Sequence, residues 1–267
     1  MYKKGKDLKN IKASIIIANY NSEMFIKECI DSLVNQSYKN LEIIFFDDSS
    51  TDKSLDEIKK FSNVKVIENN NKKKIFGSFN QMNAYINAFK KSTGEVIFFL
   101  DSDDYFHSDK IKKVIDKFNE DKYLKVLFDL PFLKFPNKIK KIKNKNKFLK
   151  NYWPYIPPQS CIAIKKEYLH EIFEATCFEN FSDIWLDFRI AIYSKYIFKN
   201  FTILKENLTY YRQTSSNISS KFIYLSPRWW RRRLQAHKYI NYFFLKYDIK
   251  YKKNFDYIIT LFLNKFF

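Results

Sequence analysis

Three carboxylates lie within a stretch of four residues, Asp101-Ser102-Asp103-Asp104, which directly follows the apolar run 96–100. A short apolar run of this kind is typical of a buried strand, and open α/β sheets bind ligands at the carboxyl ends of their strands. Carboxylates crowded at such an edge repel one another unless a cation joins them, and Mg²⁺ and Mn²⁺ prefer oxygen ligands of this type. The segment therefore indicates a divalent-metal site, although an acidic turn that caps the next helix could have the same sequence.

The segments around this cluster alternate between strand and helix patterns. Strands are expected over 14–18, 41–46, 64–67, 96–101 and 124–130, with helices over 25–34, 55–61, 77–91 and 111–118. This alternation predicts an α/β fold with a mostly parallel sheet and helices on both faces. Residues 19–21, 47–48 and 101–104 would then border one crevice. Neither a GxGxxG motif nor a GxxxxGK[ST] phosphate loop is present, so a dinucleotide-binding or P-loop domain is excluded.

The charge balance points to anionic partners. The chain of 267 residues carries 48 Lys and Arg against 29 Asp and Glu, a net charge of +19, which favours a membrane surface or nucleic acid. Most of the basic residues are Lys, and Asn, Ile, Phe and Tyr are abundant, a bias that an AT-rich genome would impose. Because Arg is the preferred residue for reading phosphates and bases and is scarce here, we expect no nucleic-acid partner.

The cysteines and the hydropathy pattern indicate the cellular compartment in which the protein is expected. Cys29, Cys161 and Cys177 are far apart and show no zinc-binding spacing, so we interpret them as reduced packing residues. No secretory signal core follows the basic N-terminus, and no apolar run approaches the length needed to span a bilayer. A cytoplasmic protein is expected.

Two segments resemble family 2 glycosyltransferases of GT-A fold: SIIIANYNSEMFIKECIDSLVNQSYKNLEIIFFDDSSTD and, further on, GEVIFFLDSDD. The resemblance covers residues 13–118, and its elements stand in the family's order and spacing. It implies a Rossmann-like, mostly parallel sheet flanked by helices, a nucleotide-sugar donor that is typically a UDP-sugar, and Mg²⁺ or Mn²⁺. The C-terminal part would be a helical appendage.

The resemblance also assigns roles to the residues that bind the donor. Ala18, Asn19, Tyr20 and Asp48 would hold the nucleobase, with Asp47 beside it. Ala18 stands where the family usually has Pro, which matters little because the contact there is made mainly by the backbone.

The acidic cluster receives its roles in the same way. Asp101 would face the ribose or the donor sugar, Asp103 would be the main metal ligand, and Asp104 would lie next to it. In the preceding DDSS turn, Ser49 replaces a usual Gly, which we expect to alter the turn slightly.

Acceptor-side chemistry is assigned to the segment FSDIWLDFR. The family often carries an acidic pair about six residues before an Arg, and Asp183 and Arg189 have this spacing. The resemblance makes Asp183 the general base and Asp187, one helical turn later, the second candidate. Ser182 stands where a Glu commonly precedes the base. The alternative is that Asp183 caps a helix and Asp187 lies on its solvated face.

The segment YYRQT is similar to a family segment in which a His faces the diphosphate or the metal. Thr214 stands at the His position. Arg212 would help to neutralise the diphosphate, or would form a structural salt bridge instead.

The chain divides into a GT-A domain over 1–215 and an aromatic, basic helical tail over 216–267. Within the domain, 13–130 would bind the nucleotide sugar and 131–215 the acceptor. Lysines crowd 134–150, which favours a solvated loop, and the aromatic and Pro residues of 153–160 could line an acceptor groove.

The tail has an amphipathic helix pattern. Ser226-Pro227 predicts its start, and an Arg triplet at 231–233 accompanies a stripe formed by Trp229, Ala236, Ile240, Phe243 and Tyr247. Such a helix either lies on an anionic membrane surface or packs its stripe on the catalytic domain.

These observations predict an inverting glycosyltransferase at the inner face of the cytoplasmic membrane. It would transfer a sugar from a nucleoside diphosphate to a hydroxyl of a surface glycan or a lipid-linked acceptor. The alternative is a catalytically impaired homologue that serves as a glycan-binding or scaffold subunit, because Ser182 and Thr214 replace the usual Glu and His.

Overall fold

The computed structural model describes residues 10–69, 77–143, 157–177, 179–214, 223–250 and 254–266. Residues 144–156 lie outside the described residues, and with them the second part of the expected lysine-rich loop 134–150 and half of the aromatic, Pro-rich segment. The described part of that lysine-rich segment forms the end of one strand and a second strand, so the expectation of a loop was wrong there.

In the part of the chain that the structure describes, four adjacent parallel strands lie at one end of a nine-stranded sheet. They are β1 (Ala13–Asn19), β2 (Leu41–Asp47), β3 (Val64–Glu68) and β4 (Val96–Asp101). Their order is β3-β2-β1-β4, and every pair among them is parallel. Residues 19, 47 and 101 therefore end neighbouring strands at one edge of the sheet. The segments that were expected to border one crevice therefore begin at the same edge of the sheet.

The remaining strands complete the sheet with mixed directions. They are β5 (Tyr105–Phe106), β6 (Val126–Phe135), β7 (Lys138–Lys141), β8 (Ile162–Lys165) and β9 (Phe201–Arg212). Strand β8 joins β4 and β6 by antiparallel pairing, β9 is parallel to β6, and β5 is antiparallel to β9. The predicted helix-flanked α/β sheet is confirmed, and its parallel order is strongest in the N-terminal half.

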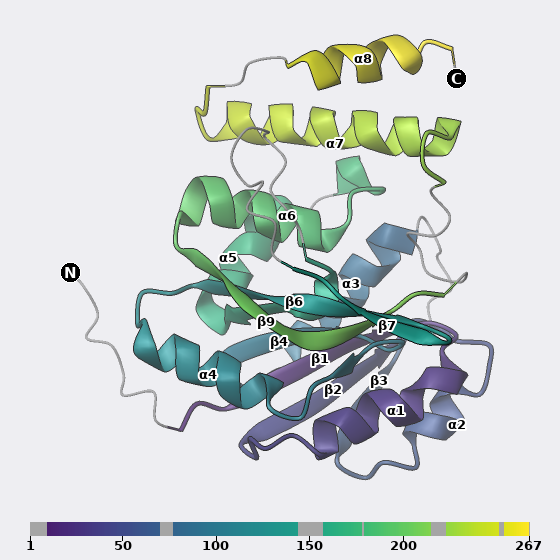
Figure 1. The fold of residues 1–267 in the computed structure, drawn as a ribbon, viewed down its shortest axis with the longest axis vertical. Coiled ribbons are helices and arrows are strands. Elements are labelled where there is room, and N and C mark those ends of the chain that lie inside the picture. Colours follow the sequence, from purple (N-terminus) through teal and green to yellow (C-terminus); the bar gives the residue numbers. More distant parts are fainter. Residues whose placement is uncertain are drawn as a thin grey trace.

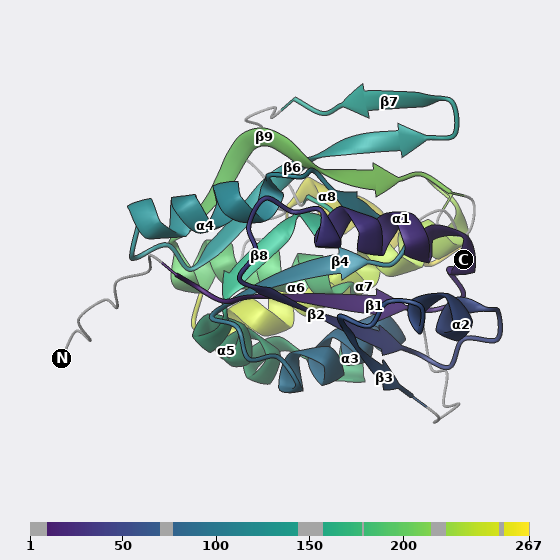
Figure 2. The ribbon, with the colours of Figure 1, turned by 90° about the horizontal axis from the view of Figure 1, so that it is seen from below.

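Helices cover both faces of the sheet (Figures 1 and 2). On one face lie α1 (Glu23–Val34) and α4 (Lys110–Glu120), and on the other α3 (Gly77–Lys90), α5 (Lys166–Thr176) and α6 (Leu186–Tyr193). The short helix α2 (Ser54–Ile58) follows β2. Side chains of β1 alternate between two cores: Ile15 and Ile17 pack with α1 and α4, whereas Ile16 packs with α3 and α6. This alternation follows from the two-residue period of a strand.

The C-terminal helices α7 (Pro227–Lys246) and α8 (Phe255–Leu263) lie beyond α6 (Figure 1). As predicted, Ser226 caps α7, and its Oγ accepts a hydrogen bond from the Trp229 amide at 3.2 Å. Of the predicted stripe, Ala236, Ile240 and Phe243 are buried in the same core as α6, whereas Trp229 and Tyr247 are partly buried. Tyr239 and Phe244 of α7 are buried in this core as well. Of the two alternatives for this helix, the structure shows packing on the catalytic domain. Among the described residues, no helix is both long and apolar enough to cross a bilayer.

Candidate active site

The loops after β1 and β2 are joined by a hydrogen-bonded turn. Asn19 Nδ2 donates to Asp47 Oδ1 at 2.7 Å, and the Asp48 amide donates to the Asn19 carbonyl at 2.9 Å. The second carboxylate oxygen of Asp47 accepts from the Ser50 amide at 2.9 Å. Both oxygens of this buried carboxylate are therefore engaged within the protein, and they hold the end of β1 against the end of β2.

The other predicted donor-binding residues lie on the same edge. Ala18 and Asp48 are half-buried, Tyr20 is exposed, and Asp48 Oδ1 accepts from Asn69 Nδ2 at 2.9 Å. Ser49 has φ of 61°, in the left-handed region that favours glycine. The backbone thus adopts the conformation that the family's usual Gly allows, at the conformational cost of a Ser.

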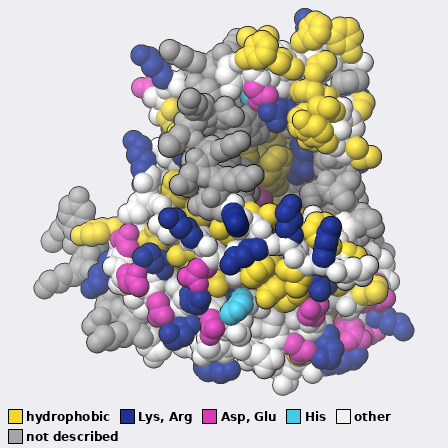
Figure 3. Space-filling model, in the orientation of Figure 1, with side chains coloured by type: hydrophobic (Ala, Val, Ile, Leu, Met, Phe, Trp, Pro, Cys, Tyr) yellow, Lys and Arg dark blue, Asp and Glu magenta, His cyan; other side chains and the backbone are white. Residues whose placement is uncertain are grey.

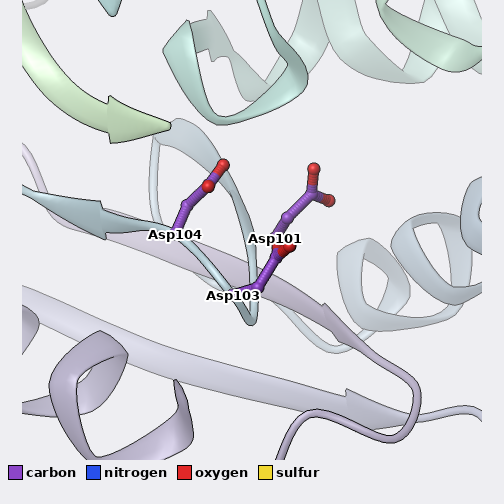
Figure 4. Close-up of side chains that lie close together, drawn as sticks. All are labelled: Asp101, Asp103 and Asp104. Atoms are coloured by element: carbon purple, nitrogen blue, oxygen red, sulfur yellow. The ribbon is translucent and has the colours of Figure 1, made fainter. Parts of the chain in front are cut away.

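The three carboxylates of the acidic cluster lie together on the loop after β4. Each of Asp101, Asp103 and Asp104 presents an oxygen within 4.8 Å of the others. Figure 4 shows the side chains of Asp101 and Asp104 extending to the same side of this loop. The sequence prediction of a clustered acidic site at the end of β4 therefore has a geometric counterpart, and this donor set suits a divalent cation.

Helix α3 supports Asp101. Gln81 Nε2 and Tyr85 Oη both donate to Asp101 Oδ1, at 2.7 and 2.6 Å. Burial and the neighbouring Asp103 raise the pKa of Asp101 to about 7, despite these two hydrogen bonds. Burial likewise raises the pKa of Asp103 to about 6. Burial and mutual repulsion thus disfavour the ionised form of these carboxylates. A bound cation would offset both effects and stabilise that form.

Asp104 is fixed from two sides. Its Oδ2 accepts from Ser160 Oγ at 2.6 Å, and its Oδ1 accepts from the Arg212 amide at 2.8 Å. Burial and the other two carboxylates raise its pKa well above the usual value. Because both oxygens are hydrogen-bonded within the protein, Asp103 is the less constrained of the two predicted metal ligands.

Behind Ser160 lies a buried ion pair. Lys110 Nζ is 2.8 Å from Asp129 Oδ1 and donates to the Ser160 carbonyl at 2.6 Å. Thr209 Oγ1 donates to Asp129 Oδ2 at 2.7 Å. This network links α4, β6 and β9 to the segment that supports Asp104.

Arg212 lies at the end of β9, which pairs with β5 directly after the acidic cluster. Its Nε donates to the Asp103 carbonyl at 2.7 Å, and its guanidinium forms an ion pair with Glu28 and stacks on Phe25. The predicted alternative of a structural salt bridge is present, beside the cluster. Thr214 follows it and is half-buried.

The acceptor-side carboxylates lie on the segment before and within α6. Arg189 fixes this segment, because its guanidinium donates to the carbonyls of Ile184 at 3.2 Å and Phe181 at 2.6 Å. Asp183 is partly exposed. Burial raises the pKa of Asp187 to about 7, and the charge of Asp101 acts in the same direction, which places Asp187 within electrostatic reach of the acidic cluster.

Several supporting residues were not identified from the sequence. They are Gln81 and Tyr85 on α3, Ser160, the Lys110–Asp129 pair and Arg232 of α7. Gln81 and Tyr85 stand four residues apart on one helix face, a spacing that could have been noticed. Ser160 and Arg232 reach the site only through the tertiary fold, so no local pattern marks them.

Comparison with known proteins agrees with this geometry. The family model "Glycosyl transferase family 2" matches residues 14–173. The chain belongs to this family. The predicted family is thus confirmed.

Two relatives illustrate the range of the family. An uncharacterized glycosyltransferase, alr2836 of Nostoc sp., is 30% identical over 220 residues, which cover 78% of this chain and 66% of the relative. The Escherichia coli enzyme WfaP, a UDP-Glc:alpha-D-GlcNAc-diphosphoundecaprenol beta-1,3-glucosyltransferase, is 43% identical over 104 residues, 38% of this chain and 39% of the relative. The chain thus spans about two thirds or less of the length of these relatives.

Among solved structures, S. aureus TarS 1-349 in complex with UDP-GlcNAc superposes with a TM-score of 0.61 at 20% identity. The match covers 86% of this chain and 66% of TarS 1-349. At this identity the similarity concerns the fold, and it supports the GT-A architecture.

Proposed function

We propose that the protein is an inverting glycosyltransferase that uses a nucleoside-diphosphate sugar. The observation that carries the proposal is the acidic cluster at the end of β4, which lies beside the joined ends of β1 and β2 in a family 2 fold. Carboxylates whose pKa values are raised by burial and by one another, and which lie together at one edge of the sheet, are candidates for binding a charged ligand.

The donor would bind along the β1–β2–β4 edge. Residues 18–20 and Asp48 would contact the nucleobase, Asp47 would position Asn19, and Asp101 would face the ribose or the sugar. UDP is the proposed nucleotide, in keeping with the TarS complex and with the UDP-glucose named for WfaP.

Asp103 and Asp104 would hold Mg²⁺ or Mn²⁺, with Asp103 offering the freer carboxylate. A bound cation would neutralise the charge that develops on the diphosphate leaving group. Arg212 contributes further positive charge beside the cluster while it fixes the backbone of Asp103.

The 183–187 segment would supply the general base. A carboxylate there would take the proton from the acceptor hydroxyl as its oxygen attacks the anomeric carbon, and the bonding electrons of the donor's glycosidic bond would leave with the diphosphate. Asp183 has the family position, whereas the pKa of Asp187, about 7, suits a base that works near neutral pH.

We further propose that the acceptor is a glycan or a lipid-linked saccharide at the inner face of the cytoplasmic membrane. WfaP acts on a diphosphoundecaprenol-linked sugar. Helix α8 and the turn that follows it expose an apolar face that consists of Phe255, Ile258, Phe262 and Phe266. The exposed lysines Lys138, Lys140 and Lys141 line strand β7 of the β6–β7 hairpin, where Figure 3 shows basic side chains on the surface. Apolar and basic side chains on one protein suit an anionic membrane surface.

Turnover with a panel of nucleotide sugars would test this function. The protein is supplied with Mn²⁺ and a diphosphoundecaprenol-linked saccharide in anionic vesicles, and nucleotide release is compared with and without the acceptor. We expect one UDP-sugar to be consumed, with acceptor-dependent product of inverted anomeric configuration. Binding of a nucleotide sugar without any turnover would favour the impaired homologue, and absence of both would exclude the proposed function.

A further inference from the structure

Arg232 of helix α7 reaches the acceptor side of the candidate site. Its Nε donates to the Asp183 carbonyl at 3.1 Å, and its Nη2 donates to Ser78 Oγ at 3.2 Å. Its guanidinium also stacks on the ring of Trp185, 4.1 Å from the ring centroid. One side chain thus joins three parts of the chain: α7, the 183–187 segment and the first turn of α3.

The same guanidinium lies in the field of both acceptor-side carboxylates. Burial lowers the pKa of Arg232 to about 10, whereas Asp187 and then Asp183 act to raise it. Arg232 in turn lowers the pKa of Asp187, against burial and the charge of Asp101. Arg228, on the same helix, opposes the positive charge of Arg232, and Tyr211 of β9 also acts on it.

We propose that Arg232 is a positioning residue of the catalytic centre, which holds the 183–187 segment against the start of α3 and supplies positive charge near Asp187. The inference rests on the proposed glycosyltransferase function. Helix α7 would then belong to the active site. Arg232 contacts α3 through Ser78, and the same helix α3 carries Gln81 and Tyr85, which support Asp101.

The contacts require an arginine. Two different nitrogens donate to groups on separate elements while the guanidinium plane stacks on an indole. A lysine ammonium is a single charged point and cannot make this combination of contacts.

The neighbouring arginines have different surroundings. Arg233 forms an ion pair with Asp256 of α8 at 2.6 Å, and Arg231 is exposed on the surface. Arg231 therefore provides a matched control on the same helix, with the same side chain and a different environment.

The test compares Arg232→Lys and Arg232→Met with Arg231→Lys and Arg231→Met in the full chain. Wild-type turnover is established first with the donor panel, and the kcat, the donor KM, the melting temperature and the pH dependence of kcat are then measured. We expect both Arg232 variants to lose about 10- to 100-fold in kcat, because the base segment is misplaced, with the donor KM nearly unchanged. The Arg231 variants should match the wild type.

The pH profile separates positioning from simple packing. Loss of the positive charge in Arg232→Met should move the acidic limb of kcat upward by about one pH unit, because Asp187 loses its cationic neighbour. Arg232→Lys keeps the charge and should leave the limb near its wild-type position.

Three outcomes overturn the inference. A folded Arg232→Lys variant with wild-type kcat would show that the contacts of the guanidinium with Asp183, Ser78 and Trp185 are not needed for catalysis. A second outcome is that kcat falls, the donor KM changes by the same factor and the melting temperature drops, while the acidic limb of Arg232→Met stays where it is in the wild type. This combination would show that Arg232 has a structural role only. A wild-type protein that turns over no nucleotide sugar overturns the proposed function itself, and the inference with it.

Discussion

At the residue scale, the site is dominated by carboxylates that the protein keeps in unfavourable surroundings. Tyr85 and Gln81 donate hydrogen bonds to Asp101, yet burial still raises its pKa to about 7. Asp187 has a pKa raised to about 7 by the same cause. Such carboxylates cost free energy of folding when they are ionised, and their gathering in one site makes them candidates for a functional role.

Asp187 gives a prediction with a definite sign. Its pKa is higher in the folded chain than in the unfolded chain, so its ionisation destabilises the fold as the pH rises from about 4 to above 7. Asp187→Asn should therefore raise the free energy of unfolding by about 1–3 kcal/mol at pH 8 and by much less at pH 5. Urea denaturation at both pH values, without added metal, measures this difference.

The same variant, set beside Asp183→Asn, decides which carboxylate is the base. Loss of the base should reduce kcat by about 100-fold or more. The residue whose loss also abolishes the acidic limb of the pH profile is the one that titrates during turnover.

The stability prediction has its own contradicting outcome. If Asp187→Asn raises the free energy of unfolding equally at pH 5 and pH 8, the pKa of Asp187 is not raised in the folded chain.

At the element scale, the contact between β1 and the start of β4 depends on Gly94. A Cβ built on Gly94 would lie 2.6 Å from Ser14 Oγ and 2.7 Å from the Lys12 carbonyl. The Gly94 amide also donates to Ser14 Oγ at 2.8 Å. The Gly of the GE-strand motif therefore permits a close backbone approach that sets the register of β4, and with it the position of Asp101.

Gly94→Ala should consequently destabilise the protein by about 2–4 kcal/mol, because backbone atoms cannot move aside without shifting β1. Thermal denaturation measures the effect. Asn87→Ala, on the partly exposed part of α3, is a suitable control that should change stability by less than about 0.5 kcal/mol. A Gly94→Ala protein as stable as this control would show that the strands can separate without cost.

The elements also show how far the sequence predicts the structure. Strands β1 to β4 were predictable because short apolar runs alternate with amphipathic helix patterns, and the DSDD segment marked the end of β4. The pairing of β5 with β9 was not, because a two-residue strand has no periodicity. Ser160 lies in the 153–160 segment, whose aromatic and Pro residues were predicted to line an acceptor groove, and its Oγ donates to Asp104. That contact spans 56 residues, and no local pattern encodes it.

At the scale of the whole molecule, helix α7 contacts both the acceptor-side segment and helix α3, which supports Asp101. The aromatic stripe of α7 was predictable from its spacing, but its partner was not, because membrane and protein surfaces both accept an apolar face. In the structure Tyr239 and Phe243 are buried in the core that contains α3 and α6. The exposed apolar face belongs to α8 instead, which shifts the proposed membrane contact to the last helix.

The central claim is that the acidic cluster binds a nucleotide sugar together with a divalent cation. Its most direct test is isothermal titration calorimetry of the full chain with UDP and UDP-sugars, with Mn²⁺ present or replaced by EDTA, for the wild type and Asp103→Asn. We expect binding by the wild type that weakens at least about 10-fold without Mn²⁺, and the same weakening in Asp103→Asn with Mn²⁺ present. Equal affinity under all of these conditions, or no binding of any nucleotide sugar by the wild type, would contradict the account.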